Sequence, residues 1–75
     1  MNAEGRKKLA DIMSKLEDIT GTLQDMASEE QEKFDNMSEG LQQSENGQKT
    51  EQAAEYLSSA ANNMESVISD IESIE

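Results

Sequence analysis

The sequence predicts an all-α protein in which two long antiparallel helices form a hairpin, and two hairpins form a homodimeric four-helix bundle. Apolar residues recur at steps of three and four along two stretches of the 75-residue chain, and a cluster of turn-forming residues separates these stretches. Only 33% of the residues are hydrophobic, which is too few for a sizeable core. The chain has no Cys or His, so neither disulfides nor a zinc site can replace that core.

The first helix is expected over about residues 4–36. Its large apolar residues follow the spacing of one buried helix face: Leu9, Ile12, Leu16, Ile19, Leu23 and Met26. Glu30 and Lys33 then stand where apolar residues are due. This polar pair either sets the register or oligomeric state, or the stripe bypasses it through Ala27 and Phe34. We favour the bypass.

The second helix is expected over about residues 45–74. After Ala53, its stripe repeats the same spacing through Leu57, Ala60, Met64, Val67, Ile71 and Ile74. Together the two stripes form the predicted core and oligomer seam. Each is about three positions wide in seven, which is wider than two helices can cover. A second copy of the chain is therefore the expected cover, as a homodimer or a higher homo-oligomer.

A turn is expected over about residues 37–44, where Ser, Gln and Gly are concentrated. Asn36 and Glu39 form a capping-box pattern for a short helical turn. Ser44 or Asn46 can cap the second helix by accepting a hydrogen bond from its first free N–H groups. A connection this short makes the helices antiparallel within one domain, residues 1–75.

Charge placement favours the same antiparallel pairing. The basic residues near the chain start (Arg6, Lys7, Lys8 and Lys15) would face residues 50–75, which hold six acids and no base. Each exposed ion pair contributes only about 0–1 kcal/mol, so several together are needed to favour one arrangement.

The composition excludes several classes of function. General acid–base catalysis usually recruits His, and a narrow bundle leaves paired carboxylates hydrated, so we expect no enzyme and no cofactor. Neither an EF-hand loop nor a Glu-x-x-His metal motif is present, so no metal site is expected. A net charge of −11 opposes direct nucleic-acid binding. No apolar run could span a membrane and no secretory signal is visible, so a cytoplasmic location is expected.

The central segment, EEQEKFDNMSEGLQQSENGQK from Glu29 to Lys49, resembles a pattern in small acidic proteins of tailed bacteriophages and prophages. In that pattern an EEQExxDNMPExLQxSExG-like segment joins two helices, the second of which is rich in Ala, Ile and Glu. Ser38 stands where the pattern often has Pro. The resemblance implies a phage setting, and hence the host cytoplasm, and it transfers no catalytic residue.

We place a predicted partner-binding site in this turn segment. Its residues are Phe34, Asp35, Asn36, Met37, Leu41, Gln42, Ser44, Glu45 and Gly47. The leading hypothesis is a non-enzymatic accessory protein that binds and inhibits a host protein involved in defence or nucleic-acid handling.

Acidic residues at helical spacing (Glu51 with Glu55, Asp18 with Asp25, Glu29 with Glu32) could imitate a phosphate backbone. The simpler interpretation is that they only keep a small oligomer soluble. Two other functions stay open. One is an oligomeric sponge for a small nucleotide signal, bound by turn amides and Lys33 or Lys49, and the other is a structural or assembly factor of the virion.

Overall fold

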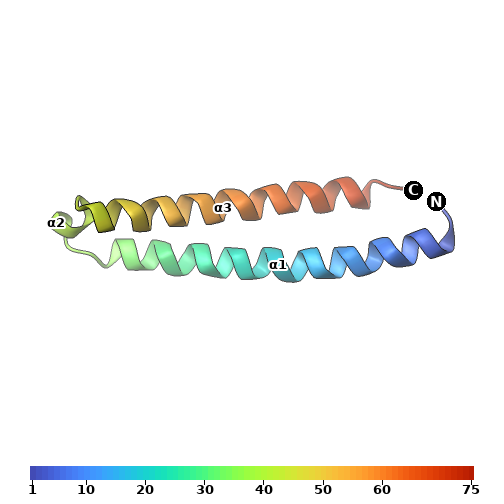
Figure 1. Ribbon diagram of the computed structural model, residues 1–75, viewed down its shortest axis with the longest axis horizontal. Helices are drawn as coiled ribbons and strands as arrows, with labels where there is room; N and C mark the ends of the chain where they lie inside the picture. The colour runs from blue at the N-terminus through green and yellow to red at the C-terminus, as the bar shows by residue number, and fades with distance from the viewer.

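The computed structural model describes residues 1–75 and is helical throughout, which confirms the all-α class. Helix α1 spans Ala3–Asp35, α2 spans Glu39–Gln42 and α3 spans Glu45–Glu72. The two long helices lie side by side and run in opposite directions, with α2 at the end where they are joined (Figure 1). The molecule is a rod with extents of 58 × 15 × 13 Å, and none of its helices is both long and apolar enough to cross a bilayer.

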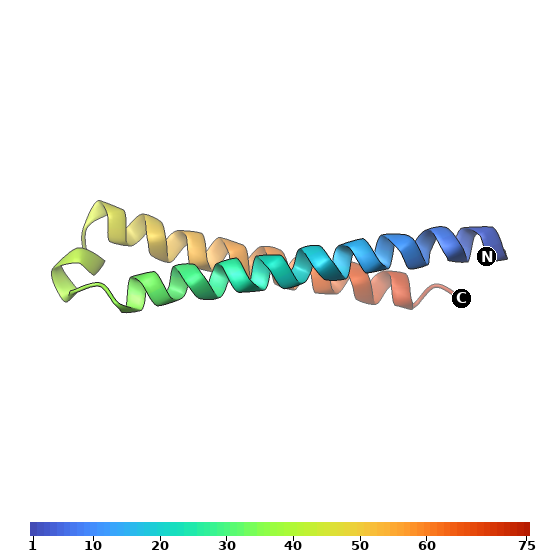
Figure 2. The ribbon, with the colours of Figure 1, turned by 90° about the horizontal axis from the view of Figure 1, so that it is seen from below.

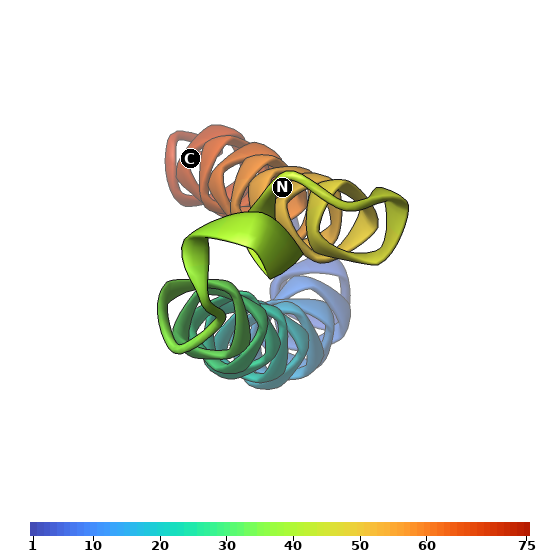
Figure 3. The same cartoon turned by 90° about the vertical axis from the view of Figure 1, so that its left-hand side faces the viewer.

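The long helices are not strictly parallel rods. In the view of Figure 2, α3 lies above α1 at the α2 end and below it at the end that holds the chain termini. Seen from the α2 end, the short helix lies across the gap between the two long ones (Figure 3). At the opposite end the Met1 ammonium group donates a 3.3 Å hydrogen bond to the carbonyl oxygen of Glu75. Both termini therefore lie at the same end of the rod.

Side-chain caps mark where the long helices begin. The Asn2 side chain accepts a 2.8 Å hydrogen bond from the N–H of Gly5 at the start of α1. The Ser44 hydroxyl accepts one of 3.1 Å from the N–H of Gly47 at the start of α3. Both caps satisfy N–H groups that have no partner within the helix.

The capping-box prediction for the turn was wrong. Asn36 does not begin the short helix but ends α1, where its N–H donates to the carbonyl oxygen of Glu32. Ser38 caps α2 instead, because its extended backbone points its hydroxyl at the N–H of Leu41, 3.4 Å away. Asn36 cannot take this role because its own backbone is still helical.

The long helices meet along a seam of buried and half-buried residues spaced at alternating steps of three and four. The first half of the seam, from α1 and the residues just after it, is Leu9, Met13, Leu16, Thr20, Leu23, Ala27, Glu30, Phe34 and Met37. The α3 half is Gly47, Thr50, Ala54, Leu57, Ala61, Met64, Ile68 and Ile71.

The structure divides the predicted stripe into two groups. Six of its residues lie in the seam: Leu9, Leu16, Leu23, Leu57, Met64 and Ile71. Ala60 is half-buried beside the seam, and the five others are exposed: Ile12, Ile19, Met26, Val67 and Ile74. Small residues explain why the helices meet along this seam, since Ala54 and Ala61 are almost fully buried and allow the helix backbones to approach closely. The seam passes through Ala27 and Phe34 beside the exposed Lys33, but Glu30 stays in it.

The expected ion pairs between the basic chain start and the acidic end are not formed. The four ion pairs, Lys8–Glu4, Lys15–Asp11, Lys33–Glu30 and Lys49–Glu45, each join residues three or four apart on one helix. Such neighbours lie about 5–6 Å apart at their β-carbons, so an exposed lysine reaches them without crossing to the other helix.

The core between the two long helices is incomplete. Only Thr20, Gly47, Ala54 and Ala61 are buried, and no large side chain is fully covered. Every leucine and isoleucine of the seam keeps part of its surface in water.

Candidate functional site

The turn that joins α1 to α3 divides its predicted site residues between the interior and the surface. Gly47 is buried, and Phe34, Met37, Gln42 and Ser44 are half-buried. The four remaining residues are exposed: Asp35, Asn36, Leu41 and Glu45. Only this second group is largely open to solvent.

The polar side chains inside the turn hold its backbone. The Gln42 side-chain amide donates a 3.0 Å hydrogen bond to the carbonyl oxygen of Phe34. The Gln48 amide donates one of the same length to the carbonyl oxygen of Gln42, and the Ser44 hydroxyl donates one of 2.5 Å to that of Leu41. Gln42 and Ser44 therefore support the turn, and Gln48, which was not predicted as a site residue, belongs with them.

The exposed surface of the turn combines one large apolar side chain with several carboxylates. Leu41 is 56% exposed on α2. Glu39, Asp35 and Glu45 are exposed in the same short stretch of chain, and Asp35 accepts a 2.9 Å hydrogen bond from the side-chain amide of Gln31. An exposed leucine among carboxylates is thus the main surface feature of the turn.

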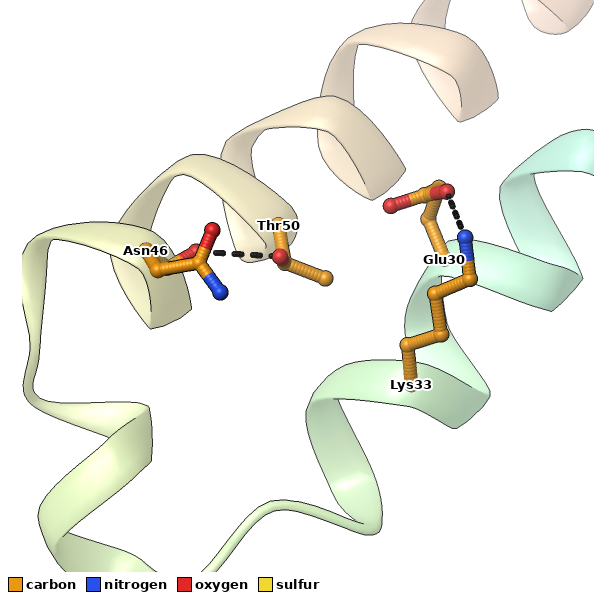
Figure 4. Close-up of polar contacts among 4 residues, drawn as sticks. All are labelled: Glu30, Lys33, Asn46 and Thr50. Atoms are coloured by element: carbon orange, nitrogen blue, oxygen red, sulfur yellow. Dashed lines mark hydrogen bonds and ion pairs between the residues drawn. The ribbon is translucent and has the colours of Figure 1, made fainter.

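Next to the turn, Glu30 and Lys33, the two polar residues that interrupt the apolar stripe of α1, form an ion pair. The Lys33 ammonium lies 2.9 Å from a carboxylate oxygen of Glu30, whose side chain is mostly covered within the seam (Figure 4). On the facing end of α3, the Thr50 hydroxyl donates a 3.0 Å hydrogen bond to the carbonyl oxygen of Asn46 (Figure 4). The hydrogen bond to Glu30, followed by the charge of Glu30, raises the pKa of Lys33 above its ordinary value.

The geometry of the turn suits surface recognition rather than enclosure of a small molecule. The one hollow in the molecule, of about 240 Å³, lies at the opposite end, between the start of α1 and the end of α3, where Leu9, Met13 and Ile71 contribute to its lining. No three acidic side chains gather closely enough to hold a metal ion. Every buried side-chain polar atom has a hydrogen-bond partner.

Most of the acidic surface carries unbalanced charge. Only four of the seventeen Asp and Glu side chains pair with a lysine. The proposed acidic rows are exposed at Asp18, Asp25, Glu29, Glu32 and Glu55, whereas Glu51 is half-buried. Residues 21–55, which form the half of the rod nearest the turn, hold nine acids and two bases, so charge is densest there.

Comparison with known protein families, with curated proteins and with solved structures finds no match to this chain.

Proposed function

We propose that this chain is a non-enzymatic phage accessory protein that acts in the host cytoplasm by binding and inhibiting a basic host protein. The partner is a protein of host defence or of nucleic-acid handling, whose phosphate-binding groove accepts carboxylates in place of phosphates. The active form is a homodimer of two antiparallel hairpins that together make a four-helix bundle.

The observation that carries this proposal is the excess of exposed, unpaired carboxylate on a narrow rigid rod. Charge held at fixed helical spacing attracts a complementary basic groove and raises the rate of association. The density of acids near the turn, beside the exposed Leu41, supports placing the contact at that end. The bacteriophage-like central segment, Glu29 to Lys49, supports the setting in which such an inhibitor would act.

The proposal is tested by capture from bacterial lysate with the tagged chain, followed by purification of the captured protein. A variant that neutralises the turn end, Glu29→Gln/Glu32→Gln/Glu55→Gln, is compared with a control that changes three acids at the other end, Glu65→Gln/Asp70→Asn/Glu72→Gln. Both variants lose the same net charge. The first is expected to lose the partner, while the control retains most of the binding.

Two further measurements complete the test. Binding of the purified partner should weaken steeply as salt rises from about 0.05 to 0.5 M, since the Debye length then falls severalfold. The partner's nucleic-acid binding or cleavage should fall when the chain is added. Capture of nothing but the chain itself, or equal losses in the two variants, would count against the proposal, and association with purified phage particles would point to a virion component.

A further inference from the structure

Beside the seam, one flank of the rod is apolar and the other is polar. The apolar flank consists of Ile12, Ile19, Met26, Ala53, Ala60, Val67 and Ile74. All but Ile74 stand one residue before a seam residue, as Ile19 stands before Thr20 and Val67 before Ile68. Ile74 continues the same spacing, seven residues after Val67.

A hydrogen bond between the long helices identifies the opposite flank. The side-chain amide of Gln24 donates a 2.7 Å bond to a carboxylate oxygen of Glu65. Gln24 and Glu65 each stand one residue after a seam residue, so these positions lie on the same side of the rod. Their equivalents along the helices are polar at Glu17, Gln31 and Ser58. The seven-residue series through Ile12 and Ile19 on α1 and through Ala60 and Val67 on α3 therefore shares the remaining side, which is the apolar flank.

The apolar flank holds most of the exposed large hydrophobic residues of the molecule. Five of the eight exposed large hydrophobic residues belong to it: Ile12 at 44%, Ile19 at 51%, Met26 at 46%, Val67 at 38% and Ile74 at 49%. The other three are Met1, Leu41 and Tyr56, at the chain start, on the turn and on the outer face of α3. Apolar residues scattered singly on a surface are ordinary, whereas a continuous exposed strip marks an interaction site.

The exposed area matches what a second copy would remove. The chain exposes 5490 Å², whereas a compact monomer of 8.3 kDa is expected to expose about 4,600 Å². The excess of about 900 Å² is close to the roughly 800 Å² that each partner buries in a standard interface. Building on the homodimer of the proposed function, we infer that the apolar flank is the dimer interface and that it packs against the same flank of a second copy related by a two-fold axis.

Side-chain size indicates how the two copies are oriented. The branched aliphatic residues of the flank, Ile12, Ile19, Val67 and Ile74, lie in the half of the rod that holds the termini, together with Ala60. The half nearest the turn holds only the unbranched Met26 and the small Ala53. If the turns lie at opposite ends of the dimer, the branched residues of each copy meet the half of the other copy that holds the flexible Met26 and the small Ala53. Alternating large and small residues fill an interface more completely than large against large.

Charge favours the same orientation. The turn half, residues 21–55, carries a net charge of −7, and the rest of the chain carries −4 and contains Arg6, Lys7, Lys8 and Lys15. Turns at opposite ends place each strongly acidic half beside the half that holds most of the bases. Turns at the same end would place the two most acidic halves together.

Sedimentation equilibrium tests the interface. The chain is expected to have twice its mass of 8.3 kDa at about 10 to 100 µM. Ile19→Gln/Val67→Gln should raise the dimer dissociation constant at least about tenfold, because each substitution counts twice in a two-fold interface. Tyr56→Gln, which removes a more exposed hydrophobic residue outside the flank, should leave the dissociation constant unchanged. A monomeric chain, or equal effects of the two variants, would overturn the inference.

Spin labels test the orientation without disturbing the interface. The chain has no Cys, and a β-carbon added at Gly40, on the turn, or at Gly21, near the middle of α1, would meet no atom within 4 Å. With turns at opposite ends, labels at Gly40→Cys should lie more than about 40 Å apart, since 28 helical residues span about 42 Å. Labels at Gly21→Cys should be much closer. Turns at the same end would lie within two to three helix spacings of about 8–10 Å, so a Gly40→Cys distance below about 30 Å would overturn the proposed orientation.

Salt separates this inference from the proposed function. Two copies of net charge −11 repel each other, so added salt should strengthen the dimer, whereas binding of a basic partner should weaken. A dimer that strengthens with salt while no basic partner is captured would support the interface and count against the proposed function.

Discussion

The place that a β-carbon would take at Gly47 is already filled by the carbonyl oxygen of Leu41. The carbonyl oxygen of Gln42 would also lie only 2.6 Å from that carbon. Gly47 has an ordinary helical backbone without positive φ, so it is required for close approach and not for conformational freedom. The first turn of α3 packs directly on the backbone of the turn because this position has no side chain.

Gly47→Ala is therefore expected to destabilise the protein by about 1–3 kcal/mol, as overpacking against rigid backbone does. Gly21→Ala is the matched control, because its added methyl group meets nothing within 4 Å and alanine favours the helix by about 1 kcal/mol. Urea unfolding at one protein concentration measures both. Stabilisation by both substitutions would show that the turn relaxes freely around Gly47.

Ser44→Ala should lower stability by about 1 kcal/mol, because Ser44 both caps α3 and bonds the carbonyl oxygen of Leu41. Ser38→Ala removes a longer cap bond, 3.4 Å, from a helix of only four residues, so a smaller loss is expected. Thermal unfolding followed by circular dichroism distinguishes the two, since 1 kcal/mol shifts the midpoint by about 4–8 °C in a chain of this size. Equal losses would contradict the supporting role of Ser44 in the turn.

Thr20→Val should stabilise the protein by about 0.5–1 kcal/mol. Thr20 is 6% exposed in the seam, and its hydroxyl bonds only the Leu16 carbonyl oxygen of its own helix, so a methyl group there adds apolar contact. Thr22→Val controls for helix propensity, since Thr22 makes the same kind of bond to Asp18 on an exposed face. Equal changes in the two unfolding free energies would show that the seam contributes nothing at Thr20.

The Lys33–Glu30 pair predicts a pH dependence at the alkaline end. Because folding raises the pKa of Lys33 above its ordinary value of 10.5, the pair stabilises the fold fully below that pH. This contribution is lost as pH rises through the higher pKa of the folded state. The advantage of the native chain over Lys33→Gln in thermal unfolding should therefore persist to about pH 9.5 and shrink above about pH 10.5. In a Glu30→Gln background the same comparison should show a weaker pH dependence.

Periodicity was sufficient to predict two long helices, and the turn residues left Ser44 or Asn46 as the cap of the second, of which the structure uses Ser44. Periodicity did not determine which side of each helix faces the other. Steps of three and four fit two adjacent seams equally well, because Ile12 precedes Met13 and Ile19 precedes Thr20. Hydrophobicity alone selects the isoleucines. In the structure the residues that follow them, Met13 and Thr20, face α3 instead, because the small Ala54 and Ala61 let the helices approach closely.

The candidate site was harder to predict because its polar bonds are tertiary. The bond from Gln42 to the carbonyl oxygen of Phe34 joins residues eight apart and exists only once α2 has folded back. No local pattern distinguishes a glutamine that holds a turn from one that meets a partner. Predicting the exposed Leu41 and the turn carboxylates required only the composition of the segment. These residues are the accessible part of the predicted site.

The hydrogen bond between Met1 and Glu75 means that the rod is nearly a closed loop of chain. A short peptide linking the two ends would make a circular molecule, and the residues of α2 could then be cut to create new ends at the other pole. Ring closure would lower the entropy of the unfolded chain and so favour the folded form. The two long helices could then occur in either order along the chain, because the contacts in the seam between them would stay the same.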